Sequence, residues 1–411
     1  MTAFRRRSRS VSLLLWLAAA AVAGPAAAQT PVAGLDLLDL QAGAVILSAT
    51  GEYNEDWSAL NLLDGTTTTG WSAPAGTPAP YAFVIELPRR HRLRSIVLDN
   101  TDAKESYPGI SAREVRVSSS TTSPSTGFTL LGTFEAPQGA RKDFLLAPPG
   151  NVAQWLKLEV VSNWGHAEYT ELMELEAYGE PEGEATAPPP VTGVYSTNYN
   201  LLLLQQRGSR VVGCYDWSDG TLMGSTDGRV VQFEWREDQG TDVGTAIMVL
   251  SSAGDYLNGL WYRGGVRQGV WKGPRAAPGA KPQCKVRAAG GIGSALAESG
   301  RAIVYGIYFD SDSARLRPES EGALGEILGL LKTQPGLRLL VEGHTDSTNS
   351  EAYNVQLSAE RAQAVRTWLI AREIVAARLE PEGLGESRPV AANTTPQGRA
   401  LNRRVEIVIL K

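Results

Sequence analysis

Short runs of alternating apolar and polar residues fill the chain between residues 35 and 179. A period of two places side chains on opposite faces of a strand, and the glycine, proline and aspartate between the runs indicate turns. The runs expected to form strands are Tyr81–Leu87, Leu93–Asp99, Glu114–Ser118, Phe128–Phe134, Lys142–Leu146, Trp155–Val161 and Leu172–Tyr178. Short strands at this spacing predict an antiparallel β-sandwich over residues 35–179.

A second β-rich unit is expected over residues 191–274, where Asp-Gly and Gly-Gly pairs separate the apolar runs. Such pairs are typical of tight hairpins. Hairpins that follow one another predict a small up-and-down barrel or a meander, with tryptophans filling its interior. Residues 180–190, rich in proline, glutamate and alanine, predict an extended linker, and residues 275–300 predict a second, flexible linker.

A helical period appears in residues 351–372, where apolar residues recur at spacings of three and four. This stripe consists of Leu357, Ala364, Val365, Trp368 and Leu369. Arg361 and Asn354 project from the same face. A buried guanidinium without an anion costs several kcal/mol. We therefore expect Arg361 to meet an anion, and Asp346, in the turn before the helix, and Asp310, at the end of an earlier strand, lie nearest in the pattern.

A series of short motifs runs through residues 303–411: Phe309-Asp310, Gly343-His344-Thr345-Asp346, Tyr353-Asn354, Leu357-Ser358, Arg361-Ala362, Arg378-Leu379, Gly383, Gly385, Pro389, Asn393, Gly398-Arg399 and Asn402 to Glu406. In these motifs and their order, residues 303–411 resemble the OmpA-like peptidoglycan-binding domain, which holds Gram-negative outer-membrane and periplasmic proteins to the cell wall. The resemblance implies an α+β fold of βαβαββ type over residues 301–411.

The resemblance also implies a ligand. In that family the equivalents of Asp346 and Arg361 grip the diaminopimelate of the peptidoglycan stem peptide: the carboxylate takes the ligand's ammonium, and the arginine takes its carboxylate. Asp310, Asn354 and Arg403 match residues that line the same pocket. These residue types suit a zwitterion, because a guanidinium forks onto a carboxylate through two parallel hydrogen bonds.

Structural alternatives stay open at these positions. Asp346 could end a strand or cap the following helix. Arg361 could pair internally with Asp310 or Asp346. His344 is interpreted as a packing or turn residue, and of the adjacent arginines 403 and 404 one is expected to face solvent.

Residues 35–179 resemble a discoidin-like, galactose-binding-type jelly roll. The matching segments include Asn61-Leu62-Leu63-Asp64-Gly65, Gly70-Trp71-Ser72 and the ending Glu171 to Gly179. Domains of that type often bind sugars, and sometimes calcium, at loops on one end. Trp164 and His166 lie in a predicted loop and are candidate glycan-binding residues, with a packing role as the alternative.

The first 28 residues have the pattern of an export signal. Arginines 5, 6, 7 and 9 precede an apolar run, Val11 to Ala23, and three alanines at 26–28 offer a cleavage site. The run has about 13 residues, too few to span a bilayer, and no later stretch reaches the necessary length. We therefore expect a periplasmic protein, associated with peptidoglycan and the outer membrane, without a transmembrane segment.

Composition narrows the classes of partner and site. The chain carries 39 basic and 44 acidic residues, and its net charge of −5 becomes −9 when four arginines leave with the signal. This balance argues against nucleic acid as a partner. In an oxidising compartment Cys214 and Cys284 predict a disulfide, the alternative being two separate thiols. The three histidines are scattered, so no metal site and no cofactor is expected.

The leading hypothesis is a non-enzymatic envelope protein that binds peptidoglycan and tethers its β domains, which could contact a polysaccharide or an envelope protein. The alternatives are a glycan hydrolase, or a secretion or stator-type component, docked on the wall by the same domain. A hydrolase would need paired acids in a cleft or a nucleophile beside a base. Pairs such as Asp99 with Asp102, or Asp238 with Asp242, fall in predicted solvated loops.

Overall fold

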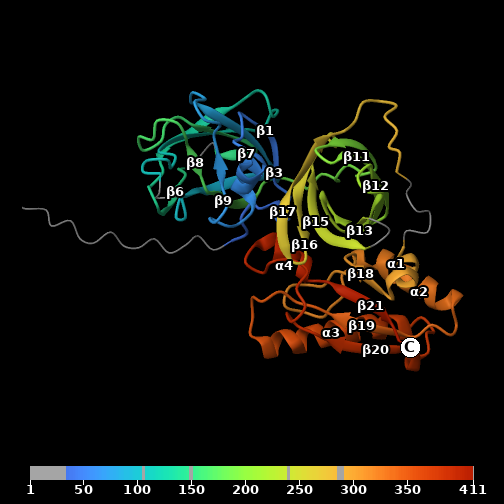
Figure 1. The fold of residues 1–411 in the computed structure, drawn as a ribbon. Helices are drawn as coiled ribbons and strands as arrows, with labels where there is room; N and C mark the ends of the chain where they lie inside the picture. Colours follow the sequence, from blue (N-terminus) through green and yellow to red (C-terminus); the bar gives the residue numbers. More distant parts are fainter. Residues whose placement is uncertain (1–33, 104–106, 148–150, 238–240, 285–290, 411) are drawn as a thin grey trace, which may run out of the picture. The chain divides into compact units, whose positions relative to one another are not determined.

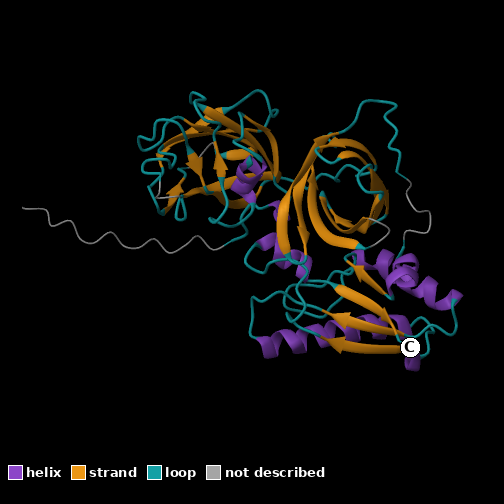
Figure 2. Cartoon of the chain, viewed as in Figure 1, coloured by secondary structure: helices purple, strands orange, loops and turns teal. Residues whose placement is uncertain are grey.

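A computed structural model describes residues 34–103, 107–147, 151–237, 241–284 and 291–410, so the predicted signal segment lies outside the described residues. Strands make up most of the part before residue 275, and the long helices lie in the C-terminal part (Figure 1, Figure 2). The expected class is confirmed: a β-sandwich, a barrel-like sheet and an α+β domain follow one another along the chain.

The first domain is the β-sandwich. Its larger sheet runs β1-β3-β7-β4-β5, with β6 and β9 also paired to β3, and a two-stranded sheet joins β2 to β8. The strands are β1 (Val45–Ala49), β2 (Trp71–Ser72), β3 (Tyr81–Asp99), β4 (Glu114–Ser120), β5 (Thr129–Glu135), β6 (Arg141–Leu145), β7 (Val152–Val160), β8 (Glu171–Leu172) and β9 (Glu174–Pro181).

The long strand β3 pairs with different strands of the sandwich along its length. Its first residues, Tyr81–Glu86, pair with β7, and its last residues, Ser95–Asp99, pair with β6 and β9. The sequence predicted two strands here, but the backbone stays extended between them. Pro88 has no N–H to donate, and the register with β7 shifts between Glu86 and His91, so the ladder is interrupted without a turn.

The second domain is an antiparallel sheet whose strands pair in sequence order. They are β10 (Gly193–Thr197), β11 (Asn200–Arg207), β12 (Arg210–Tyr215), β13 (Gly220–Asp227), β14 (Val230–Glu237), β15 (Asp242–Leu250), β16 (Tyr256–Arg263) and β17 (Val266–Pro274). Backbone hydrogen bonds from Ala276 to Val194 (2.8 Å) and from Asn198 to Lys272 (3.1 Å) join the last strand to the first. The sheet therefore closes as an up-and-down barrel.

Aromatic side chains fill the barrel interior. Phe233, Trp235 and Trp271 are buried and belong to one apolar cluster. Gly244 lies opposite Trp235 across the β14–β15 ladder, and a Cβ at this position would overlap the indole ring. Glycine thus makes room for the large ring, and the interior is packed with side chains as expected.

Cys214 of β12 and Cys284 form a disulfide, with a Cα–Cα distance of 5.8 Å. The backbone N–H of Cys284 also donates to Asp216 (2.8 Å). Together these contacts hold the segment that follows the barrel against β12.

The C-terminal domain has a mixed sheet in the order β18-β21-β19-β20, in which β19 and β20 are parallel. Its elements are α1 (Ile292–Ser299), β18 (Arg301–Val304), α2 (Glu321–Thr333), β19 (Leu339–Gly343), α3 (Glu351–Ile370), β20 (Leu379–Gly383), α4 (Pro396–Asn402) and β21 (Val405–Ile409). The short helix α4 between the last two strands is an addition to the expected βαβαββ order. Thr395 caps it, and Pro396 occupies its first turn.

Helix α3 confirms Leu357, Val365 and Leu369 of the predicted helical stripe, whereas Trp368 is half-buried. Its buried residues are Asn354, Leu357, Ser358, Arg361, Ala362, Val365 and Leu369. Ala362 takes the place predicted for Ala364, which is half-buried. The helix packs directly on β19. A Cβ added at Gly343 would overlap the backbone of Ser358, so glycine is needed for this close approach.

The prediction of a flexible linker over residues 275–300 is wrong in its last third. Residues Ile292–Ser299 form α1, which buries Ile292, Ala295 and Leu296 at helical spacing. These three side chains join the apolar core of the C-terminal domain. The burial of this stripe explains why the segment is helical despite its glycine and alanine content.

Contacts between the domains place the described residues, from 34 to 410 with their gaps, in one compact unit. Glu86 of the sandwich and Arg229 of the barrel form an ion pair of 2.7 Å, with side-chain exposures of 2% and 7%. Gln397 of α4 donates to the Asp39 carboxylate of the sandwich (2.6 Å). In this structure the C-terminal domain and the barrel therefore both contact the sandwich through buried polar groups.

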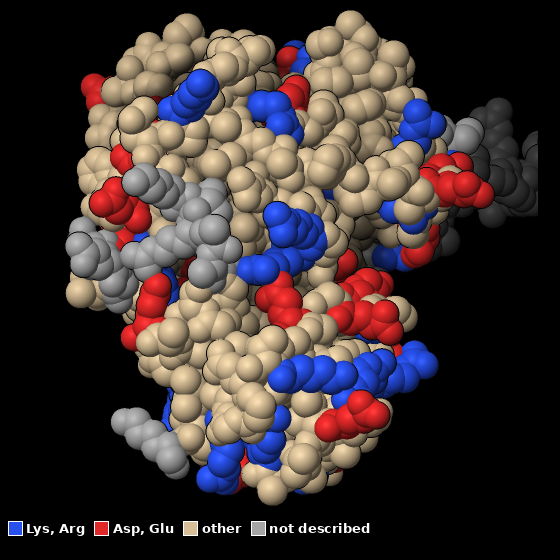
Figure 3. All heavy atoms as spheres, turned by 90° about the vertical axis from the view of Figure 1, so that its right-hand side faces the viewer, with Lys and Arg blue, Asp and Glu red and all other residues tan. Residues whose placement is uncertain are grey.

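Basic and acidic side chains lie side by side over the face drawn in Figure 3. Among the described residues, no helix has the length and apolar character needed to cross a membrane.

Candidate functional site

The candidate site lies where the loop after β19 meets the start of α3. Ser350 caps this helix by accepting a hydrogen bond from the N–H of Tyr353. The side-chain amide of Asn354 donates to the backbone oxygens of Asp346 (3.0 Å) and Asn349 (3.2 Å). The helix end and the loop that carries Asp346 are thereby fixed to each other.

Arg361 is a buried arginine without an acidic partner among the described residues. The residue is 8% exposed, and its Nε donates to the backbone oxygen of Ser313 (3.0 Å). Its guanidinium carbon lies 5.1 Å from the centre of the Phe309 ring. Burial, together with the positive charge of Arg403, lowers the pKa of Arg361. Asp346 and Asp312 act in the opposite direction and raise this pKa, but among the described residues neither lies within ion-pair distance of the guanidinium.

Asp346 pairs with Arg403 instead of Arg361. The Nη1 of Arg403 lies 2.6 Å from Oδ2 of Asp346, and the N–H of Thr348 donates to Oδ1 (3.0 Å). Burial acts to raise the pKa of Asp346, but the hydrogen bonds from Arg403 and Thr348 outweigh it and the pKa is lowered. Asp346 is therefore an ionised carboxylate at neutral pH.

The internal ion pair considered for Arg361 does not form in this structure. Asp310 pairs with Arg315 across the loop that follows Phe309, and Asp346 pairs with Arg403. Asn354 was expected to line the pocket, whereas its amide is committed to backbone oxygens and to Glu386. Asn354 is therefore a positioning residue.

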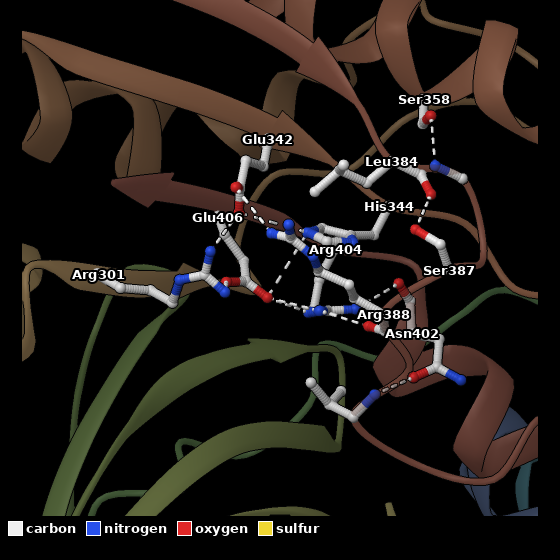
Figure 4. Close-up of polar contacts among 12 residues, drawn as sticks. Arg301, Glu342, His344, Ser358, Leu384, Ser387, Arg388, Asn402, Arg404 and Glu406 are labelled. Carbon is white, nitrogen blue, oxygen red and sulfur yellow. Dashed lines mark hydrogen bonds and ion pairs between the residues drawn. The ribbon is translucent and has the colours of Figure 1, made fainter. Parts of the chain in front are cut away.

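A buried ionic cluster beneath the site is the feature that sequence reasoning missed. Glu342 of β19 and Glu406 of β21 are register partners on neighbouring strands. Arg301 forms ion pairs with both, at 2.8 and 3.0 Å, while Arg388 contacts Glu342 (3.2 Å) and Arg404 contacts Glu406 (Figure 4). Alternation along the strands did not reveal this cluster, because Glu342 and Glu406 alternate with core residues such as Val341 and Ile407 and so lie on the opposite face, where a polar residue is expected to be exposed.

Arginines fill the role that a metal ion would have in this cluster. Ligand atoms of Glu342, His344 and Glu406 lie within 4.8 Å of one another. Positive charge from Arg301, Arg388 and Arg404 already surrounds them and disfavours a further cation. His344 is 1% exposed, and neither ring nitrogen has a hydrogen-bond partner among the described residues, in agreement with a packing role.

We expect the folded protein to lose stability in mild acid because of His344. Burial, followed by the charges of Arg404, Arg301 and Arg388, lowers the pKa of His344 to about 2. Between that value and about 6.5, the unfolded chain binds a proton that the folded protein does not, so stability falls as the pH decreases. Taking the pH from 7 to 5 should therefore lower the free energy of unfolding by about 2 kcal/mol through this residue.

Denaturant unfolding at pH 7 and pH 5 checks this expectation. The His344→Gln variant should lose about 2 kcal/mol less than the parent between the two pH values. The raised pKa of Glu342 acts in the opposite direction in both proteins and cancels in the comparison. An identical pH dependence of the two proteins would contradict the assignment.

A row of aromatic rings crosses the loops of the sandwich. Ring centres are separated by 6.1 Å between Tyr107 and His166, 5.6 Å between His166 and Tyr169, and 5.8 Å between Tyr169 and Tyr53. Tyr53 and Tyr107 are about half exposed. His166 thus lies in an exposed aromatic row, whereas Trp164 is half-buried, donates to Ala136 (3.1 Å) and is covered by Arg113.

Comparison with known proteins agrees with this architecture. Residues 308–403 match the OmpA family, and residues 71–181 match the Sad1/UNC-like C-terminal family. The peptidoglycan-binding protein ArfA of Mycobacterium tuberculosis is 44% identical over 103 residues, which are 25% of this chain and 32% of ArfA. The matched region thus spans about a third of the length of that relative.

Solved structures resemble the two ends of the chain. The peptidoglycan-associated lipoprotein of Burkholderia pseudomallei is 33% identical and covers 25% of this chain and 88% of its own, with a TM-score of 0.24. The C-terminal domain of a chitobiase from Bacteroides fragilis is 22% identical and covers 34% of this chain and 96% of its own, with a TM-score of 0.30. By the match of residues 308–403 and the identity to ArfA, this chain contains a domain of the OmpA family, which a β-sandwich and a β-barrel precede.

Proposed function

We propose that this chain binds peptidoglycan non-covalently and without catalysing a reaction. In this proposal Arg361 and Asp346 bind the diaminopimelate of the stem peptide. The observation that carries the proposal is the buried guanidinium of Arg361, which has no acidic partner among the described residues. A carboxylate from a ligand would complete its hydrogen bonds and neutralise its charge.

The ligand's ammonium would be taken by Asp346. This carboxylate is ionised, and its present partner, Arg403, is about one-third exposed and can turn toward solvent. The side chain of diaminopimelate ends in an amino-acid head, so a single group supplies both the carboxylate for Arg361 and the ammonium for Asp346. Charge-assisted hydrogen bonds of this kind contribute about 1.5–3 kcal/mol each, which supports weak to moderate binding of one head.

The identity of the stem residue provides the test. The chain should sediment with sacculi that contain diaminopimelate, and free meso-diaminopimelate should release it. Sacculi that carry lysine at the same position should bind much less, because the lysine side chain ends in an ammonium and offers Arg361 no carboxylate. Equal sedimentation with both kinds of sacculi, unaffected by the free amino acid, would overturn the proposal.

The proposed location follows from the same ligand. Peptidoglycan lies in the envelope, and a wall-bound chain with an export signal and a disulfide would act in the periplasm near the outer membrane. In this role the C-terminal domain fixes the two β domains to the wall.

A second candidate function is glycan recognition by the sandwich. The row formed by Tyr53, Tyr169, His166 and Tyr107 supports it, because aromatic faces stack on the apolar faces of sugar rings. A glycan array should therefore report binding that the Tyr53→Ala, Tyr107→Ala double variant loses. An array without signal above background would remove this candidate.

A further inference from the structure

The pocket of Arg361 continues beyond the C-terminal domain. Arg361, Phe309 and Arg403 line a cavity of about 1130 Å³ whose other walls come from the sandwich and the barrel. Part of the wall is the proline-rich segment of residues 182–189. Sites for drug-sized ligands usually measure about 300–1,000 Å³, so this cavity can hold more than one amino-acid head.

The lining of this cavity is rich in arginine, and most of these arginines already have acidic partners. Arg229 pairs with Glu86 (2.7 Å), Arg317 with Asp227 (3.6 Å), Arg403 with Asp346 and Arg404 with Glu406. Two further lining arginines, Arg89 and Arg90, come from the middle of β3, where the ladder is interrupted.

Arg89 and Arg90 have no ion pair with an acid among the described residues. Arg89 donates to the backbone oxygen of Gly183, and its Nε is buried without a hydrogen-bond partner among the described residues. Arg90 donates to the backbone oxygen of Thr121 (3.1 Å). The same wall contains two further acids, Glu182, which pairs with Arg92 (2.8 Å), and Glu184. Arg89, Arg90 and Arg361 outnumber them, and a ligand with several carboxylates would neutralise the remaining positive charge.

We infer that Arg89 and Arg90 form a second anion subsite, which receives further carboxylates of the same stem peptide whose diaminopimelate is held at Arg361. The inference rests on the proposed function. A stem peptide carries carboxylates outside its diaminopimelate head, and one cavity is lined by Arg89 and Arg90 of the sandwich and by Arg361 of the C-terminal domain. The sandwich thereby contributes directly to recognition of the wall.

Isothermal titration of the full chain with two ligands tests the inference. The parent protein should bind the stem tripeptide, alanyl-γ-glutamyl-diaminopimelate, about tenfold more tightly than free meso-diaminopimelate. The Arg89→Gln, Arg90→Gln double variant should lose this advantage and keep the affinity for the free amino acid. The Arg89→Lys, Arg90→Lys variant, which retains both charges, should keep much of the advantage.

Arg116→Gln serves as the matched control, because it removes one arginine charge from the same sandwich at a position outside the cavity lining. Its affinities should equal those of the parent. A glutamine double variant that still binds the tripeptide as the parent does would overturn the second subsite while leaving the proposed function intact. Absence of binding of free diaminopimelate to the parent protein would instead overturn both.

Discussion

Replacing Arg361 by glutamine is expected to weaken binding of diaminopimelate by at least about 100-fold while changing the free energy of unfolding by less than about 1 kcal/mol. The binding loss follows from removal of the cation that meets the ligand's carboxylate. The small effect on stability follows from the absence of an ion-pair partner among the described residues, since no buried acid is left uncompensated. An arginine in a buried ion pair would instead cost about 3–5 kcal/mol.

Two further variants of α3 sharpen this experiment. Arg361→Lys keeps the charge but loses the planar fork, so its affinity should fall between those of the parent and the glutamine variant. Arg366 lies on the same helix and donates to the backbone oxygen of Leu379 (3.0 Å), and Arg366→Gln should bind as the parent does. Titration with meso-diaminopimelate and urea unfolding are measured on each protein. Loss of folding along with binding in Arg361→Gln would assign the residue a structural role.

The position of Arg361 could be predicted because a helix has a fixed period. Once Leu357 and Val365 define the buried face, a residue four positions from each must share it. The partners of Arg361 could not be predicted in the same way. Whether Asp346 meets Arg361 or Arg403 depends on side-chain directions in a loop, and the loop geometry is set by the amide of Asn354, whose role the sequence pattern did not reveal.

The domain folds were also accessible from local pattern, whereas the contacts between domains were not. Alternation and turn residues predict each strand of the barrel, because neighbouring strands pair in sequence order. The ion pair of Glu86 with Arg229 joins residues far apart in sequence, and nothing in the neighbourhood of either residue specifies the other. The helix Ile292–Ser299 is a further case. Its burial in the C-terminal core is a tertiary contact, and the local composition of residues 275–300 predicted a flexible linker instead.

Arg404→Met is expected to lower the free energy of unfolding of the C-terminal domain by about 3–5 kcal/mol. Arg404 is 4% exposed, and its Nε donates to Glu406 (2.8 Å). It also donates to the backbone oxygens of Arg388 (2.9 Å) and Asn402 (3.3 Å). Methionine fills a similar volume but leaves the buried Glu406 carboxylate with Arg301 as its remaining ion-pair partner and leaves two buried carbonyl oxygens without this donor.

The adjacent residue supplies the control for this prediction, because successive side chains at the start of β21 point in different directions. Arg403 is about one-third exposed and forms a single ion pair, with Asp346, so Arg403→Met should lower the free energy of unfolding by less than about 1 kcal/mol. Urea unfolding of both variants measures the difference. Equal, small losses in the two proteins would contradict the prediction. They would mean that the buried cluster of Glu342, Glu406 and Arg301 holds β18, β19 and β21 together without a contribution from Arg404.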